Sequence, residues 1–169
     1  MNGRMSRRGF LTCTAATLAA PMVVHASVLG KGGATPPSER ITAAGIGIHG
    51  RGFSDLQWMI GNEDVQVLAI CDLWKQQRDV VKKFVDEKYG NTDCKQYLDI
   101  REFLAERPDI DAVLIATGDH WHAPASVMAM RAGKDVYTEK PSCMTISEGQ
   151  KVVETAKRYG RVYQTGTQR

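Results

Sequence analysis

Residues 41–52 read ITAAGIGIHGRG and decide how the rest of the chain is interpreted. The run begins as an apolar strand and then places Gly45, Gly47 and Gly50 at the spacing G-x-G-x-x-G. In dinucleotide-binding folds the first glycine permits a tight turn and the second lets a pyrophosphate approach the backbone, while the third lets the next helix pack closely on the sheet. An ordinary strand-to-helix turn is the alternative interpretation.

A second strand and an acidic residue strengthen the dinucleotide interpretation. The apolar residues Val65–Cys71 follow at the distance expected of a βαβ unit, and Asp72 comes directly after them. An acid about 20 residues beyond the glycines can accept hydrogen bonds from a ribose 2′-hydroxyl and would repel a 2′-phosphate. The sequence therefore predicts NAD as the cofactor, with NADP less favoured. Arg51 and Lys75 keep NADP open, because nearby cations can accommodate a phosphate.

The composition is that of an ordinary globular protein. The chain has 169 residues, of which 43% are hydrophobic and 24% charged, so one folded domain is expected. The net charge of +3 comes from arginines in the first 26 residues, and the neutral remainder has no basic footprint for nucleic acid. The four cysteines show no C-x-x-C spacing, which predicts buried free thiols and no metal site.

Residues 1–26 are expected to be a targeting segment. SRRGFLT, residues 6–12, resembles the twin-arginine export signal, with Thr12 in place of its lysine, and the small residues at 24–26 suit cleavage. This predicts a periplasmic or extracellular protein, with an uncleaved anchor as the alternative. The twin-arginine route carries folded proteins, which fits a cofactor enzyme. Residues 27–40, rich in Gly and Pro, are expected to be a flexible linker.

Beyond the glycine-rich run, strands alternate with helices, which predicts a doubly wound parallel sheet, a Rossmann domain, over residues 41–169. Ligands of such sheets lie outside the carboxyl ends of the strands. The expected helices are residues 53–60, 74–89, 100–106, 124–132 and 146–158, and the later strands are residues 65–71, 95–98, 111–116, 136–138 and 162–165.

A polar loop, TGDHWHA, follows the clearest buried strand at residues 117–123. Loops directly after such strands commonly carry binding and catalytic residues. His120 and His122 could orient a nicotinamide or donate to a substrate oxygen. Alternatively, His122 caps the next helix and His120 is simply a surface residue. Contacts with the cofactor are expected from Thr117, His120 and Trp121.

Glu139-Lys140-Pro141 follows the next strand. The Lys140 ammonium could donate to a substrate oxygen, or the amine could act as general acid or base. Pro141 would fix a bend, which a cis peptide bond can provide. A surface turn with an ion pair is the alternative.

Three motifs in this order and spacing resemble the Gfo/Idh/MocA family of oxidoreductases over residues 41–169: GIGIHGRG at 45–52, DHWHA at 119–123 and EKP at 139–141. The resemblance implies NAD or NADP binding and hydride transfer at a hydroxyl-bearing carbon of a sugar, cyclitol or related polyol. It makes Lys140 the residue that touches both substrate and cofactor, and we add His122 as a second catalytic candidate. The expected cofactor-binding residues are Gly45, Gly47, His49, Gly50, Arg51, Asp72, Thr117, His120, Trp121, Glu139 and Lys140.

The chain departs from the family pattern in two places. Gly118 stands where the family usually has proline. The family's second domain, an open and mostly antiparallel sheet that covers the nicotinamide, is missing from the sequence. We therefore expect the N-terminal part of a longer protein, inactive alone and homo-oligomeric at full length. The alternatives are an NAD-dependent glycoside hydrolase that oxidises its sugar transiently, and a non-catalytic dinucleotide-binding module.

Overall fold

The computed structural model describes residues 35–167. The predicted export signal, at residues 1–26, and the linker up to residue 34 lie outside the described residues. The chain divides into two units, residues 1–36 and 37–169, and the described fold is that of the second unit. It opens with a short 3-10 helix, η2 (Pro37–Glu39).

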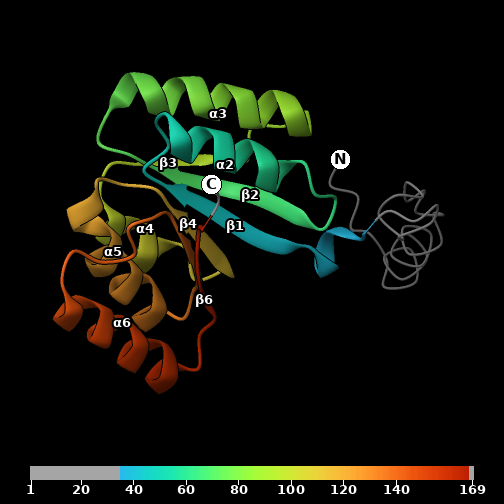
Figure 1. The fold of residues 1–169 in the computed structure, drawn as a ribbon. Coiled ribbons are helices and arrows are strands. Elements are labelled where there is room, and N and C mark those ends of the chain that lie inside the picture. Colours follow the sequence, from blue (N-terminus) through green and yellow to red (C-terminus); the bar gives the residue numbers. More distant parts are fainter. Residues whose placement is uncertain (1–34, 168–169) are drawn as a thin grey trace, which may run out of the picture. The chain divides into compact units, whose positions relative to one another are not determined.

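A six-stranded parallel sheet forms the middle of this unit, in the order β3-β2-β1-β4-β5-β6 (Figure 1). β1 and β4 are neighbours in the sheet, so the strand order reverses between them. This reversal opens a crevice at the carboxyl ends of the two strands, where ligands of doubly wound sheets bind. The strands are β1 (Ile41–Ile46), β2 (Val65–Cys71), β3 (Lys95–Tyr97), β4 (Ala112–Ile115), β5 (Asp135–Thr138) and β6 (Tyr163–Thr165).

Helices cover both faces of the sheet. Two helices, α2 and α3, lie on one face, and three helices, α4, α5 and α6, lie on the other (Figure 1). Leu56 and Val81 pack from the first pair against the sheet, and Phe103, Ala129 and Val152 pack from the second group. The helices are α2 (Arg51–Ile60), α3 (Lys75–Tyr89), α4 (Ile100–Glu106), α5 (Asp119–Arg131) and α6 (Ile146–Tyr159).

The predicted doubly wound fold is confirmed, with one clear error at a helix start. We expected a helix from residue 124, because proline is favoured in the first turn of a helix. Instead α5 begins at Asp119, after the extended Gly118. Its first turn is tightened by a hydrogen bond from Trp121 N to Gly118 O, at 2.8 Å. Pro124 lies inside α5, so the predicted loop of His120 and His122 is a helix start.

Two of the predicted free thiols are buried. Cys71 ends β2 and Cys94 precedes β3, and both are unpaired, whereas the free Cys143 is half-buried. Burial raises the pKa of each of the two buried thiols to about 12. Within residues 35–167, no helix is long and apolar enough to cross a bilayer.

Candidate active site at the carboxyl ends of the strands

Two of the predicted glycines shape the loop between β1 and α2. Gly47 has φ +75°, and a Cβ added to it would lie 2.7 Å from the backbone of Ala116 and Thr117, beyond β4. Gly50 has φ +53°, and no atom lies within 4 Å of a Cβ added to it. The loop therefore needs glycine at both positions for its backbone conformation, and it leaves an uncovered approach to the backbone at Gly50.

The close approach between helix and strand occurs at a glycine that the motif does not include. We expected Gly50 to provide it. A Cβ added to Gly52 would instead lie 2.0 Å from Gly47 O, so α2 contacts the loop there. Gly45, inside β1, packs against Ile48 and Leu56. A Cβ added to Gly45 would lie 2.8 Å from the side chain of Ile48 and 3.2 Å from that of Leu56. The role predicted for the third glycine therefore belongs to Gly52, and the tight turn comes after Gly45.

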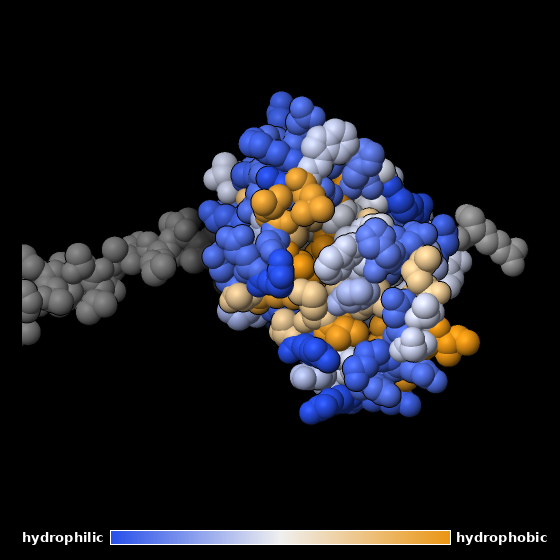
Figure 2. All heavy atoms as spheres, turned by 90° about the vertical axis from the view of Figure 1, so that its left-hand side faces the viewer, coloured by the Kyte–Doolittle hydropathy of each residue, from blue (hydrophilic) through white to orange (hydrophobic). Residues whose placement is uncertain are grey.

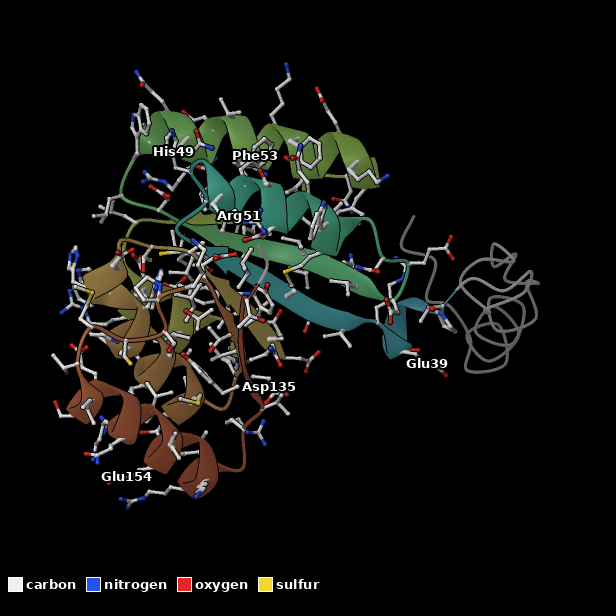
Figure 3. The ribbon with its side chains drawn as sticks, in the orientation of Figure 1. Glu39, His49, Arg51, Phe53, Asp135 and Glu154 are labelled. Atoms are coloured by element: carbon white, nitrogen blue, oxygen red, sulfur yellow. The ribbon has the colours of Figure 1, made fainter. Side chains whose placement is uncertain are left out.

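Asp72 joins the end of β2 to the glycine-rich loop. Its Oδ2 accepts a hydrogen bond from Ile48 N at 2.9 Å, and its Oδ1 accepts one from Trp74 N at 2.8 Å. His49 is exposed in the same loop, and its ring centroid lies 5.1 Å from that of Trp74. Figure 3 shows His49 beside the start of α3. The carboxylate is thus fixed by two backbone donors, and each oxygen retains capacity for a further hydrogen bond.

A hollow of about 620 Å³ opens between the ends of β1, β2 and β4. Five predicted residues line it, Gly47, Asp72, Thr117, His120 and Trp121. Its apolar walls are formed by three residues that were not predicted, Leu73, Leu98 and Met128. Figure 2 faces this end of the molecule, and apolar surface crosses its middle between hydrophilic regions.

These residues fit an NAD molecule. No side chain caps the amino end of α2, so its N–H groups and positive dipole end can face a pyrophosphate. Gly50 leaves room for that approach. Asp72 at the rim of the hollow can accept from ribose hydroxyls, and apolar walls suit a flat base. His49, Arg51, Glu139 and Lys140 do not line the hollow.

A second group of predicted residues meets on the other side of the loop. Arg51, the first residue of α2, donates from Nε to Glu139 Oε1 at 3.2 Å. Its Nη2 lies 2.8 Å from Asp55 Oδ1. Figure 3 shows Arg51 on the side of α2 that faces the central strands. Asp55 was not predicted, although its position four residues after Arg51 is the spacing of a helical ion pair.

Lys140 lies at the carboxyl ends of the strands, two residues after the last residue of β5. It is exposed, and its backbone N–H donates to Glu139 Oε2 at 3.1 Å. The bond between Lys140 and Pro141 is cis, which is one way expected for this proline to fix a bend. The ion pair that we gave as the alternative is also present, but it joins Glu139 to Arg51 and not to Lys140.

His122 has a different environment from the one expected of a catalytic base. Its side chain is buried, with 2% exposure. Nδ1 lies 2.6 Å from Pro141 O, and Nε2 lies 3.0 Å from Thr117 O. With a backbone carbonyl at each ring nitrogen, His122 connects the segments after β4 and β5, and its ring is shielded from solvent. These contacts suit positioning of the two segments, and the predicted catalytic role of His122 stays a prediction.

The comparison with known families agrees with this geometry. A family model described as "Oxidoreductase family, NAD-binding Rossmann fold" (GFO_IDH_MocA) matches residues 39–167. The chain belongs to the Gfo/Idh/MocA family. NAD is accordingly the cofactor of this domain, as predicted.

Several curated proteins similar to this chain are named as glycosidases. "Glycosyl hydrolase family 109 protein 1" of Shewanella sp. (strain MR-4) is 34% identical over 155 residues, covering 88% of the chain and 32% of the relative. "Alpha-N-acetylgalactosaminidase" of Shewanella oneidensis is 35% identical over 130 residues, covering 73% of the chain and 27% of the relative. The chain thus spans about a third of the length of the curated relatives it matches.

Solved structures that resemble this chain include inositol dehydrogenases. Myo-inositol 2-dehydrogenase from Lactobacillus plantarum superposes with a TM-score of 0.64 at 22% identity, over 75% of this chain and 36% of that one. Scyllo-inositol dehydrogenase from Lactobacillus casei, with bound NAD(H) and scyllo-inositol, gives 0.66 at 20% identity, over 75% and 36%. At these identities the likeness establishes the fold.

Proposed function

We propose that the full-length protein is an NAD-dependent oxidoreductase that acts on a hydroxyl-bearing carbon of a sugar, cyclitol or related polyol. The observation that carries the proposal is the 3.2 Å contact between Arg51 and Glu139. It joins the start of α2, directly after the glycine-rich loop, to the segment after β5 that carries the primary amine of Lys140. An amine at this position can interact with a substrate oxygen.

In this proposal Lys140 acts at the oxygen of the substrate. NAD, when bound, supplies the acceptor for the hydride that leaves the carbon. The hydroxyl proton must leave as the carbon becomes a carbonyl, and the Lys140 side chain, in its neutral amine form, receives it. Asp72 and the glycine-rich loop hold the cofactor, while His122 keeps the segments after β4 and β5 in register.

A second candidate is a glycoside hydrolase that oxidises its sugar, eliminates the aglycone and reduces the product again. It is favoured by the names of the curated relatives, glycosyl hydrolase family 109 and alpha-N-acetylgalactosaminidase. The first oxidation is the same hydride transfer, so Lys140 has the same role in both candidates. The two differ in whether NADH accumulates.

The test uses the full-length protein with NAD and two substrate sets. A dehydrogenase reduces NAD in proportion to the inositol or free sugar consumed. A redox-assisted hydrolase releases p-nitrophenol from an α-N-acetylgalactosaminide with no net NADH. Lys140→Met should lower either rate by a factor of about 100 or more, and Lys151→Met, on the exposed face of α6, should not. Full activity of Lys140→Met would refute the proposal.

We also propose export by the twin-arginine route, on the strength of SRRGFLT at residues 6–12. A reporter fused after residue 40 should reach the periplasm. Replacing Arg7 and Arg8 together by lysine should retain the reporter in the cytoplasm. Equal export of both reporters would contradict the proposed route.

A further inference from the structure

Two acidic side chains are buried together beside Lys140. Asp55 of α2 is 5% exposed, and Glu139 after β5 is 4% exposed. Their carboxyl groups are close enough to hydrogen-bond to each other. Both contact the same guanidinium, since Arg51 lies 2.8 Å from Asp55 Oδ1 and 3.2 Å from Glu139 Oε1. Two buried carboxyl groups therefore share one arginine.

Neighbouring buried carboxyl groups do not both ionise readily, because each charge loses hydration and repels the other. Burial, and then the hydrogen bond with Glu139, raise the pKa of Asp55, although Arg51 acts in the opposite direction. A single proton between the two groups leaves one negative charge. That charge matches the one guanidinium, and a carboxyl O–H supplies the donor for the hydrogen bond between the acids.

The acid pair is connected to Lys140 through the backbone. Glu139 Oε2 accepts the Lys140 N–H at 3.1 Å, and Glu139 N donates to Ile115 O, at the end of β4, at 2.8 Å. Arg51 directly follows the glycine-rich loop. Any change in the acid pair thus reaches both the lysine segment and the start of α2.

We propose that Asp55 and Glu139 hold one proton between them and, with Arg51, position the Lys140 segment beside the glycine-rich loop. The proposed function enters only where Lys140 is taken to meet a substrate, because the acid pair positions the Lys140 segment whether or not a polyol binds. The charged groups that act on the Asp55 carboxyl are Arg51 from its own helix and Glu139 from the end of β5.

The shared proton predicts a particular pH dependence of stability. Because the pKa of Asp55 is raised, the folded protein keeps a proton that Asp55 of the unfolded chain releases above its ordinary pKa of 3.8. The free energy of unfolding therefore falls as the pH rises from that value, until the folded pair also ionises. Asp55→Asn keeps an N–H donor but cannot ionise, so its melting temperature should fall less with pH than that of the wild type.

The measurement is thermal unfolding of the full-length protein from about pH 3.5 to about pH 8, a range that begins below the ordinary pKa of an Asp carboxyl. Asp86→Asn is the matched control, because Lys82 and Asp86 form the same i, i+4 pair on α3, at 2.7 Å. The control should keep the wild-type slope of melting temperature against pH. An Asp55→Asn variant with the wild-type slope would overturn the shared proton.

Positioning is tested by two substitutions of one residue. Glu139→Gln retains an oxygen that can accept the Lys140 N–H, and Glu139→Ala does not. Hydrogen exchange at the Lys140 amide should be faster in Glu139→Ala and near the wild-type rate in Glu139→Gln. In turnover, kcat should fall about 100-fold in Glu139→Ala, with the KM for NAD changed less than about twofold, and the Gln variant should restore most of kcat.

Two further results separate the outcomes. If Glu139→Ala does not fold, Arg51→Gln tests the same link, and it too should speed exchange at the Lys140 amide. Unchanged exchange in every folded variant of Glu139 and Arg51 would refute the positioning role. The pH slope and the amide exchange need no turnover. A wild type that is stable but converts neither polyol nor glycoside would therefore reject the proposed function and leave this inference standing.

Discussion

Two glycines have nearly the same backbone conformation in different surroundings. Gly47 has φ +75° and backbone atoms 2.7 Å from an added Cβ, whereas Gly90 has φ +67° and nothing within 4 Å. An alanine costs about 1–2 kcal/mol at either position for its left-handed backbone. Only Gly47→Ala adds a clash with backbone atoms. It should lose about 3 kcal/mol or more of unfolding free energy together with NAD binding, as measured by urea unfolding and NAD titration.

Gly90→Ala serves as the control for that variant. It should lose only the backbone cost of about 1–2 kcal/mol and bind NAD as tightly as the wild type. Equal losses in the two variants would show that the segment after β4 moves away from the new methyl group.

The choice of cofactor is expected to depend on the Asp72 carboxylate. Asp72→Ser removes a charge that attracts ribose hydroxyls and repels a 2′-phosphate. NAD should bind about tenfold more weakly, the loss of roughly one charged hydrogen bond, and NADP should bind more tightly than to the wild type. Fluorescence titration with both cofactors measures the ratio. Asp79→Ser, on exposed α3, should leave the ratio unchanged, and an unchanged ratio in Asp72→Ser would contradict this role.

At the scale of elements, one buried lysine in the turn before β5 holds the loop between α4 and β4. Lys134 is 1% exposed, and its Nζ donates to the carbonyl oxygens of Arg107, Pro108 and Ile110 at 2.7 to 3.0 Å. Lys134→Met would leave these carbonyls without that donor, at a cost of about 2–4 kcal/mol. Urea unfolding measures the loss. Lys83→Met, exposed on α3, should change stability by less than about 0.5 kcal/mol, and equal effects would make Lys134 dispensable.

The sequence predicted elements better than the contacts between them. The helix ends at Gly90 and Gly160 were predicted correctly, because glycine readily adopts the left-handed conformation that terminates helices. Both residues have that conformation. Asp55 and Lys134 were not identified, because a charged residue is usually exposed. Their burial depends on partners far along the chain, such as Glu139 for Asp55. Periodicity detects which face of an element is apolar, and it carries no information about such partners.

For the whole molecule, the strand order explains why the predicted residues separate into two groups. β1 lies between β2 and β4, so the glycine-rich loop borders both sides of the crevice. Asp72 after β2 and the residues after β4 line the apolar hollow, whereas Glu139 and Lys140 follow β5, one strand farther along the sheet. The sequence identified both groups as carboxyl-end segments. The sequence alone does not give the order of the strands in the sheet, so it could not show that the two groups are separate.

Because the loop joins these two sides, NAD should stabilise the whole second unit and not the hollow alone. A ligand at 100 times its Kd adds about 2.7 kcal/mol to the free energy of unfolding. For a domain of this size that corresponds to an increase in melting temperature of several degrees. Differential scanning fluorimetry with increasing NAD measures it, with Gly47→Ala as the variant that should not respond. A melting temperature independent of NAD would mean that the described residues do not bind the cofactor of their family as a folded unit.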